Sequence, residues 1–458
     1  MEQQGADLRS GKVGKLLFSL ALPTVTSQIV NMLYNLVDRI YIGHIPGVGR
    51  AALTGVGVCL PIIMLITAFS SLAGAGGAPR ASIEEGKGNP EESERIMGNC
   101  LTLLLIASVV LTAFFVLFNR PILLSFGASA DTIDYAVAYM RIYALGTIFV
   151  QLTLGMNIFI TAQGFSKVSM QTVLIGAGLN TVLDPIFIFA LNLGVQGAAL
   201  ATILSQAVSA VWVLRFLMGR KTKWRLKRQY LRPRAKVVLP CVALGLSPFI
   251  MQATESVLAV CFNTSLLKYG GDIAVGAMTV LTSIMQFAML PLQGLTQGAQ
   301  PIISYNYGAR LPQRVREAFR LLLRVCVIYS ASLWALVELF PGIFVRMFNS
   351  DPELVAYAVP ALRVYMAMCC IFGIQIACQQ TFIALGNAKS SLFLAVLRKI
   401  ILLIPLIYIL PNFFENQAFA VFLAEPVADT MAVLTTAIMF AVQFKKSMKR
   451  LEAPPWEK

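Results

Sequence analysis

Long runs of apolar residues, separated by short polar stretches, dominate the chain from residue 16 to residue 443. An α-helix needs about 20 apolar residues to cross the hydrocarbon core of a bilayer, and helices are the natural way to pair every backbone polar group there. We count twelve such runs, which we predict to be membrane-spanning helices: 16–37, 52–78, 97–118, 136–161, 169–191, 195–214, 237–266, 273–305, 321–340, 355–384, 391–410 and 419–443.

Composition supports a membrane protein. Of the 458 residues, 57% are hydrophobic and only 13% are charged, whereas soluble domains have about 25% charged residues. The sequence therefore predicts an all-α polytopic membrane protein. The first apolar run is too long for the apolar core of a signal peptide, so we expect it to be the first span.

Basic residues predict the orientation of the spans. Most of the 37 Lys and Arg residues fall before the first span, after the last one, or in the even-numbered loops, and the segment 219–235 is the most basic of these loops. Because such loops stay in the cytoplasm, both termini and this linker are expected on the cytoplasmic side of the cell inner (plasma) membrane. Anionic lipid at that surface accounts for the net charge of +15, so no nucleic-acid partner is expected.

The two halves of the chain resemble each other when one is shifted by 222 residues. Polar and turn-forming positions coincide in one ungapped frame, and one inserted residue later Leu200-Ala201 falls on Leu423-Ala424. We therefore predict two six-helix lobes, 1–218 and 236–458, joined by the linker 219–235. Because each lobe has an even number of spans, both lobes have the same orientation in the membrane. We therefore expect a pseudo-twofold axis along the membrane normal, with a cavity between the lobes. The positions that coincide include Gly76 with Gly298, Gly86 with Gly308, Arg141 with Arg363, Tyr143 with Tyr365, Gly164 with Gly386 and Lys167 with Lys389.

Asp184 is the most informative ionisable residue, because a charge at bilayer depth is costly and marks function by default. It lies in the middle of the fifth span, four residues after Asn180 and on the same helix face. Pro185 has no N–H and so frees the carbonyl of Thr181. These oxygens suit a hard cation such as Na⁺, and the same carboxylate could instead carry a proton. The alternative is an ion pair between Asp184 and a buried arginine such as Arg141.

Other acids in or near the spans allow two interpretations. Asp38 ends the first predicted span, so it is either a membrane site or a solvated helix end beside Arg39. Glu255 is mid-span in the seventh helix, and it is either a second coupling residue or a polar contact between helices. We favour a structural role for the remaining pair, Glu425 and Asp429, with Arg398 or Lys399 as partners.

Several kinds of chemistry have no support in the sequence. There is no GxxxxGK[ST] loop for a nucleotide, no HExxH or other metal cluster, and no GxSxG nucleophile. The eight cysteines lie in apolar segments without a CxxC pair, and we interpret them as small buried hydrophobic residues. We therefore expect neither an enzyme nor a bound cofactor, and no metal other than Na⁺ as a coupling ion.

With these residues in view, the sequence resembles the multidrug and toxic compound extrusion (MATE) family, of the multidrug/oligosaccharidyl-lipid/polysaccharide flippase superfamily, over all twelve spans. Each motif is modest alone, but their order and spacing are specific together. The motifs are Ala21-Leu22-Pro23, Asn35-Leu36-Val37-Asp38, Asn180 with Leu183-Asp184-Pro185, Gly194-Val195-Gln196-Gly197-Ala198-Ala199, Gln297-Gly298-Ala299-Gln300-Pro301 and Ala424-Glu425-Pro426-Val427-Ala428-Asp429.

The resemblance implies export of apolar, often cationic drugs and toxins in exchange for Na⁺ or H⁺. It implies a coupling site in the first lobe and a supporting polar network around it, and it makes Pro23 a proline whose bending gates transport. The coupling site would be Asp38, Asn180, Asp184 and Thr202, and the network Tyr139, Tyr34 and Asn157.

One departure from the family pattern concerns the second lobe. In one branch of the family an acid on the seventh helix pairs with an acid on the tenth. Glu255 matches the acid on the seventh helix, but the tenth span here, 355–384, contains no acid. We therefore predict that coupling depends on the first lobe. The hypothesis is a secondary active multidrug antiporter that works by alternating access as a monomer within membrane lipid. The alternatives are a lipid or glycan-lipid flippase of the same superfamily and a membrane scaffold that transports nothing.

Overall fold

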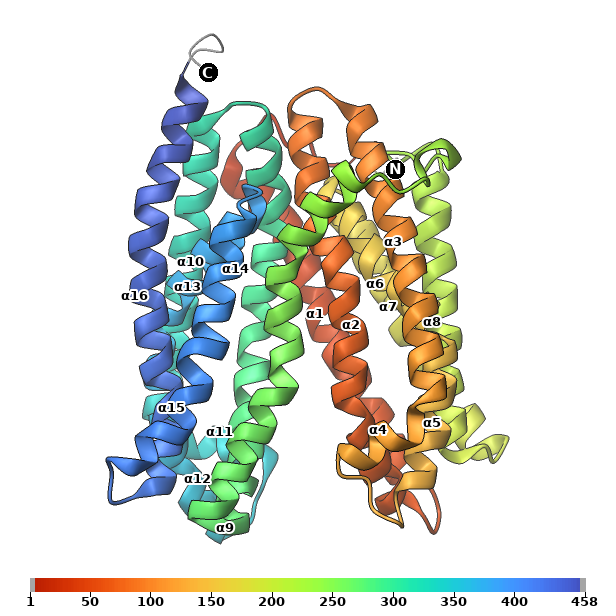
Figure 1. Ribbon diagram of the computed structural model, residues 1–458, viewed down its shortest axis with the longest axis vertical. Coiled ribbons are helices and arrows are strands. Elements are labelled where there is room, and N and C mark those ends of the chain that lie inside the picture. The colour runs from red at the N-terminus through yellow and green to blue at the C-terminus, as the bar shows by residue number, and fades with distance from the viewer. Residues whose placement is uncertain (1–4, 454–458) are drawn as a thin grey trace.

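The computed structural model describes residues 5–453, and the outermost residues of the two predicted lobes, 1–4 and 454–458, lie outside this range. Within the described range the chain is helical throughout and has no β-strand. Long helices run roughly side by side, and both ends of the chain lie at the same end of the molecule (Figure 1). The all-helical fold class predicted from the apolar runs is confirmed.

Within residues 5–453, nine helices are long and apolar enough to cross a membrane, and two bent helix pairs add two further spans. The nine are α1 (Val13–Gly43), α2 (Gly49–Gly86), α3 (Pro90–Leu117), α7 (Ser166–Pro185) with the π-helical turn η1 (Ile186–Ala190), α8 (Gly194–Met218), α9 (Ala235–Gly308), α10 (Pro312–Leu339), α14 (Ala388–Val396) with η3 (Leu397–Leu403), α15 (Ile404–Ile409) and η4 (Leu410–Asn412), and α16 (Gln417–Glu452).

Helix α9 contains two spans. It has 74 residues, which at 1.5 Å per residue would be on the order of 110 Å, several times the thickness of the hydrocarbon core. The break is at Gly271, whose φ of 69° lies in the left-handed region that favours glycine. The chain turns back there, and its two arms correspond to the predicted spans 237–266 and 273–305.

Two predicted spans are bent. The span 136–161 is the pair α5 (Ile133–Leu145) and α6 (Thr147–Ala162), which meet at 56°, and the span 355–384 is the pair α12 (Pro352–Tyr365) and α13 (Cys369–Ala384), which meet at 50°. Each pair follows a short helix, α4 (Asn119–Ser125) or α11 (Pro341–Phe348). Breaks of a few residues do not interrupt an apolar run, so hydropathy alone could not locate them.

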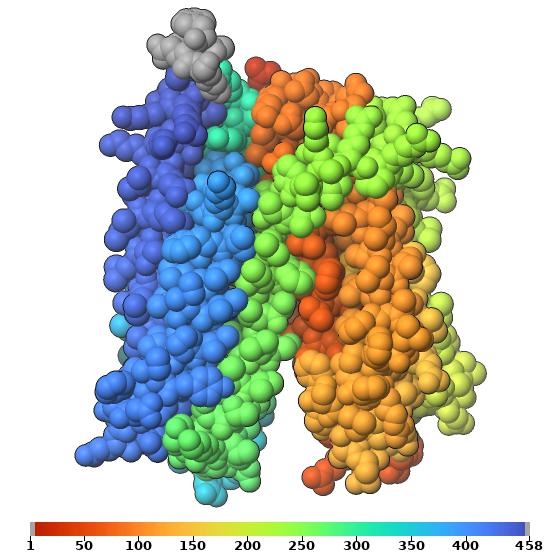
Figure 2. Space-filling view, in the orientation of Figure 1, coloured from red at the N-terminus to blue at the C-terminus, as the bar shows by residue number. Residues whose placement is uncertain are grey.

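The helices form two bundles with a cleft between them. In Figure 1 the helices up to α8 gather on one side and those from α9 onwards on the other. Figure 2 shows the bundles touching near the end that carries the segment after α8 and separated at the opposite end. We call these the closed end and the open end. The lobe boundaries at 218 and 236 remain a prediction from the internal repeat.

Glycines allow backbone contact between the bundles at the closed end, where α2 packs against both arms of α9. A Cβ atom on Gly76 would lie 2.7 Å from the backbone nitrogen of Gly245, and one on Gly308 would lie 2.8 Å from the backbone carbon of Ile83. Gly86 is equally crowded by the backbone of α9. Gly86 and Gly308 also occupy equivalent positions in the repeat. The contact between the bundles at the closed end therefore lies where the pseudo-twofold axis is expected.

The basic segment between α8 and α9 is docked on the first bundle. Trp224 is buried and donates its indole N–H to Glu85 at 2.9 Å. The backbone N–H groups of Lys223 and Trp224 both donate to the side-chain oxygen of Gln163. Lys227 forms an ion pair with Glu94. The segment predicted as a linker is therefore a fixed cap on the ends of α2, α3 and α6.

We expect Gly86→Val to open the closed end. The added side chain has backbone on its far side and cannot be accommodated by a change of rotamer, so it should destabilise the closed arrangement by about 1–3 kcal/mol. Hydrogen–deuterium exchange should become faster in segments 80–87 and 302–309. Gly57→Val is the matched control, because a Cβ at Gly57 on the same helix meets nothing within 4 Å. Equal exchange in both variants would contradict this explanation of how the bundles close.

Candidate functional site

Two carboxyl groups from distant parts of the chain meet inside the first bundle. Asp38 lies on α1 and Asp184 on α7, two helices that pack against each other. Asp184 is fully buried and Asp38 is 9% exposed. The two carboxyl groups lie close enough to act on each other's charge. The two acids predicted for the first lobe therefore form one pair.

Asn180 and Thr202 complete the centre of the site. The amide of Asn180 donates to a carboxylate oxygen of Asp184 at 3.2 Å and approaches the hydroxyl of Thr202 at 3.4 Å. Asn180 shares a face of α7 with Asp184 because the two are four residues apart, and Thr202 comes from α8. Four side chains on three helices thus surround one point.

Buried oxygen atoms in this site have no donor. Within the described chain, one carboxylate oxygen of Asp38, one of Asp184 and the amide oxygen of Asn180 are buried without a hydrogen-bond partner. A buried acceptor without a donor costs about 1–3 kcal/mol, and two buried anions side by side also repel each other. Such a group of acceptors is suited to a positive charge, and either a metal cation or a proton would satisfy it.

The helix changes its winding directly after the aspartate. Helix α7 ends at Pro185, and the π-helical turn η1 follows. Proline supplies no N–H to the carbonyl four residues earlier, and π-helical turns are frequent at functional sites. The hydroxyl of Thr181 donates to Ala177 at 2.9 Å, so within this structure that side chain bonds back along its own helix.

The polar network predicted around the site is only partly assembled. Tyr139 on α5 is buried beside Asp38 and Thr202, and Tyr34 is half-buried beside Asp38 on α1. Asn157 is different, since its amide donates to the backbone carbonyl of Ser169 at 3.2 Å. The structure thus brings both tyrosines to the aspartate pair but holds Asn157 against α7 in a contact of its own.

Two alternatives from the sequence are inconsistent with the structure. Arg141 is exposed, and among the described ion pairs it has none with Asp184. Asp38 is not a solvated helix end, because α1 continues to Gly43. The helix continues beyond the predicted end of the first span at residue 37, because polar side chains end an apolar run without breaking backbone hydrogen bonds.

Pro23 lies inside α1, where this helix contacts the second bundle. It is buried, and the hydroxyl of the next residue, Thr24, donates to the backbone carbonyl of Gly294 on α9 at 2.6 Å. A proline removes one hydrogen bond from the helix and makes it easier to bend. A bend of α1 at Pro23 would therefore change the contact between the two bundles. The gating role of Pro23 remains a prediction.

A second group of charges lies inside the other bundle. Arg398 donates to Glu425 at 2.9 Å and to Asp429 at 2.7 Å, and Lys399 forms an ion pair with Glu255. The expectation that Glu425 and Asp429 have a basic partner agrees with the contacts of Arg398. Lys399 was not anticipated as the partner of Glu255. The signal that could have indicated it was two consecutive basic residues in the middle of a predicted span.

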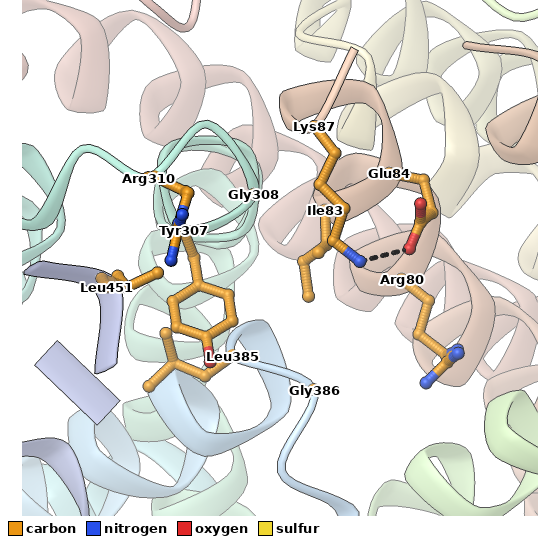
Figure 3. Close-up of a pocket in the computed structure, with 10 residues that line it drawn as sticks. All are labelled: Arg80, Ile83, Glu84, Lys87, Tyr307, Gly308, Arg310, Leu385, Gly386 and Leu451. Atoms are coloured by element: carbon orange, nitrogen blue, oxygen red, sulfur yellow. Dashed lines mark hydrogen bonds and ion pairs between the residues drawn. The ribbon is translucent and has the colours of Figure 1, made fainter. Parts of the chain in front are cut away.

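The cavity in Figure 3 is separate from both charged groups. It lies between the bundles at the closed end, has a volume of about 490 Å³ and includes no residue predicted for the coupling site. Lys87 points toward Glu84 on one side of it, and Arg310 and Tyr307 line the other side (Figure 3).

Comparison with known proteins gives consistent results. The MatE family model matches residues 23–186 and 248–409. "Multidrug export protein MepA" of Staphylococcus haemolyticus (strain JCSC1435) is 24% identical over 92% of each chain. Two solved structures superimpose with TM-scores of 0.90 and 22% identity. One is a MATE in the bent conformation, covering 97% of this chain and 98% of its own. The other is an outward-facing multidrug resistance MATE transporter, covering 98% and 99%.

The two structural matches show that the fold is shared over nearly the whole chain, and the family match covers most of the sequence in two segments, one on each side of the linker. Together they confirm the resemblance inferred from the motifs. This chain belongs to the MatE family of multi-pass membrane transporters and is not an enzyme.

Proposed function

We propose that this protein exports a range of apolar and cationic drugs and toxins in exchange for Na⁺ or H⁺, which binds at Asp38 and Asp184. The similarity to multidrug export proteins supports the substrate class. The observation that carries the coupling proposal is the buried carboxyl pair with unpartnered oxygens. Asn180 and Thr202 complete the site, and no cofactor takes part.

Coupling requires that the cation stabilise one conformation of the transporter more than the other. The carboxyl pair joins α1 to α7, and α1 also contacts the second bundle at Thr24. A cation between Asp38 and Asp184 removes their repulsion and draws α1 toward α7. That change in α1 would reach the interface through Pro23, which is how we propose that ion binding favours drug release.

The orientation follows from the basic segments. We propose that the closed end, which carries the docked segment 219–234, faces the cytoplasm of the cell, because basic loops remain on that side. The open cleft then faces outward (Figure 2). In this state the coupling cation enters from outside as the drug leaves. All four proposed ion-binding residues come from one chain, so a monomer in the plasma membrane would suffice.

The charges of the second bundle disfavour a lipid or glycan-lipid flippase. A cleft for anionic headgroups should expose unpaired basic side chains, but Arg398 and Lys399 are both buried and paired with acids. The more basic cavity in Figure 3 lies at the closed end, outside the open cleft.

We expect Asp184→Asn to abolish gradient-driven export. The amide keeps the size of the side chain but has no negative charge to balance a cation and cannot take up a proton. Gradient-driven uptake of a cationic dye into inverted vesicles, where export is directed into the lumen, should therefore fall about tenfold or more. The control is Glu338→Gln, an acid at the end of α10 near Arg363, which should retain wild-type efflux. Equal efflux in wild type and Asp184→Asn would contradict the proposed site, and a scaffold protein would show no efflux in any variant.

Thermal unfolding should identify the coupling cation. If Na⁺ binds, replacing K⁺ by Na⁺ at constant ionic strength should stabilise the purified protein, by about 2.7 kcal/mol at 100 times the dissociation constant. Asp38→Asn should remove this effect, because it removes one of the two carboxylates. If a proton binds, Na⁺ should have no effect and a pH gradient alone should drive transport. Export that responds to neither gradient would refute coupled antiport.

A further inference from the structure

Five charged side chains form a compact cluster in the second bundle, at bilayer depth. Arg398 binds Glu425 and Asp429, and Lys399 binds Glu255. In four of the five, no more than 8% of the side chain is exposed. Charges at this depth are costly and usually functional.

The two bases reach different helices because they are consecutive. Neighbouring residues on a helix point about 100° apart, so Arg398 faces α16 while Lys399 faces the first arm of α9. Both lie in the π-helical turn η3, and such turns recur at functional sites. The cluster therefore links the eleventh span to two neighbouring helices, α9 and α16, through a π-helical turn.

Counted with all five groups ionised, the cluster is short of one positive charge. It contains three acids, Glu255, Glu425 and Asp429, but only two bases, Arg398 and Lys399. An uncompensated charge inside a membrane protein costs several kcal/mol. The cluster is therefore suited to receive one additional positive charge.

Glu255 is the member that an incoming cation can reach. Its side chain is 49% exposed, whereas that of its partner Lys399 is 7% exposed. Three residues earlier on α9, Gln252 donates to Ser71 of α2 at 2.8 Å, across the gap between the bundles. Residues three apart share a helix face, and Glu255 is one turn nearer the open end. It therefore faces the cleft close to where the bundles separate.

The surroundings favour an organic cation over a metal ion. The ammonium of Lys399 already occupies one side of the Glu255 carboxylate, and the described residues contain no group of three acidic, His or Cys side chains suited to a metal.

The two halves treat their charges differently at related positions. In the frame that aligns Leu200-Ala201 with Leu423-Ala424, Thr202 of the coupling site falls on Glu425. The first half leaves oxygens without donors, but the second half provides its own cations on the eleventh span. A small ion is therefore suited to the first half, and a cation that can compete with a lysine is suited to the second.

We propose that Glu255 binds the positive charge of the exported compound by exchange with Lys399, and that Lys399 limits the site to substrates with one positive charge. When a cationic substrate enters the cleft, the Glu255 carboxylate turns from the ammonium to the substrate. Lys399 remains beside it and repels a second substrate charge. This inference rests on the proposed drug-export function and adds a residue that sets its charge selectivity.

Equilibrium binding to the purified protein in nanodiscs of zwitterionic lipid tests the proposal without requiring coupled transport. The probes are tetraphenylphosphonium with one charge, dequalinium with two, and neutral triphenylphosphine oxide. Glu255→Gln should weaken binding of tetraphenylphosphonium about tenfold or more, equivalent to about 1.4 kcal/mol, and leave the neutral probe unchanged. Lys399→Gln should strengthen dequalinium relative to tetraphenylphosphonium by about tenfold, because the cluster then lacks two positive charges.

The double variant Glu255→Gln/Lys399→Gln separates position from net charge. It keeps the cluster one positive charge short but leaves no acid at the cleft, so it should bind tetraphenylphosphonium as weakly as Glu255→Gln. Wild-type affinity in the double variant would overturn the proposal. Glu338→Gln and Lys389→Gln are matched controls outside the cluster and should bind all probes as wild type does.

The outcomes also separate this proposal from the function on which it rests. If Glu255→Gln is folded by thermal unfolding and binds all three probes as wild type does, the charge-selection proposal fails while drug export stands. If Glu255→Gln does not fold, the Lys399→Gln comparison decides, and an unchanged ratio of dequalinium to tetraphenylphosphonium affinity overturns the proposal. If the wild type binds none of the probes, both proposals fail.

Discussion

The inability of lipid to solvate charge or to pair with the backbone governs this protein. It restricts the spanning segments to helices whose backbone bonds are internal, and it confines ionisable side chains to places where the chain itself supplies partners. The buried ionisable residues of the spans form two clusters, one around Asp38 and Asp184 and the other around Arg398 and Lys399. Each cluster joins helices that are distant in the sequence, so these charges also help to determine which helices lie together.

The two halves meet the same constraint in different ways. The first leaves carboxylate and amide oxygens without donors, which suits it to a cation taken from outside. The second pairs its buried acids with built-in bases, and Glu255 is the one member of that cluster with a largely exposed side chain. The corresponding helices of the two halves therefore carry different polar residues. Helix α7 has an asparagine and an aspartate, whereas η3 has an arginine and a lysine.

The interface between the bundles explains why such differences can matter over a distance. At the closed end the helices touch backbone to backbone through Gly76, Gly245, Gly86 and Gly308. Contacts this close are either made or broken, because packed interfaces do not deform smoothly. The link from Thr24 to Gly294 ties α1, which carries Asp38, to the same interface. A small shift of α1 at the ion site can therefore bias two discrete arrangements of the bundles.

The sequence by itself determined the helical membrane fold, the approximate limits of all twelve spans, and the identity of the ionisable residues at membrane depth. Hydropathy and helical spacing are local properties, so they can be read along the chain. Only the tertiary structure decided that Asp38 meets Asp184, that Asn157 bonds to Ser169, and that Lys399 rather than a second acid faces Glu255. It also placed the break at Gly271 and the bends in α5–α6 and α12–α13. These features depend on which faces of distant helices pack together, and the hydropathy of a segment does not indicate which other helices it contacts.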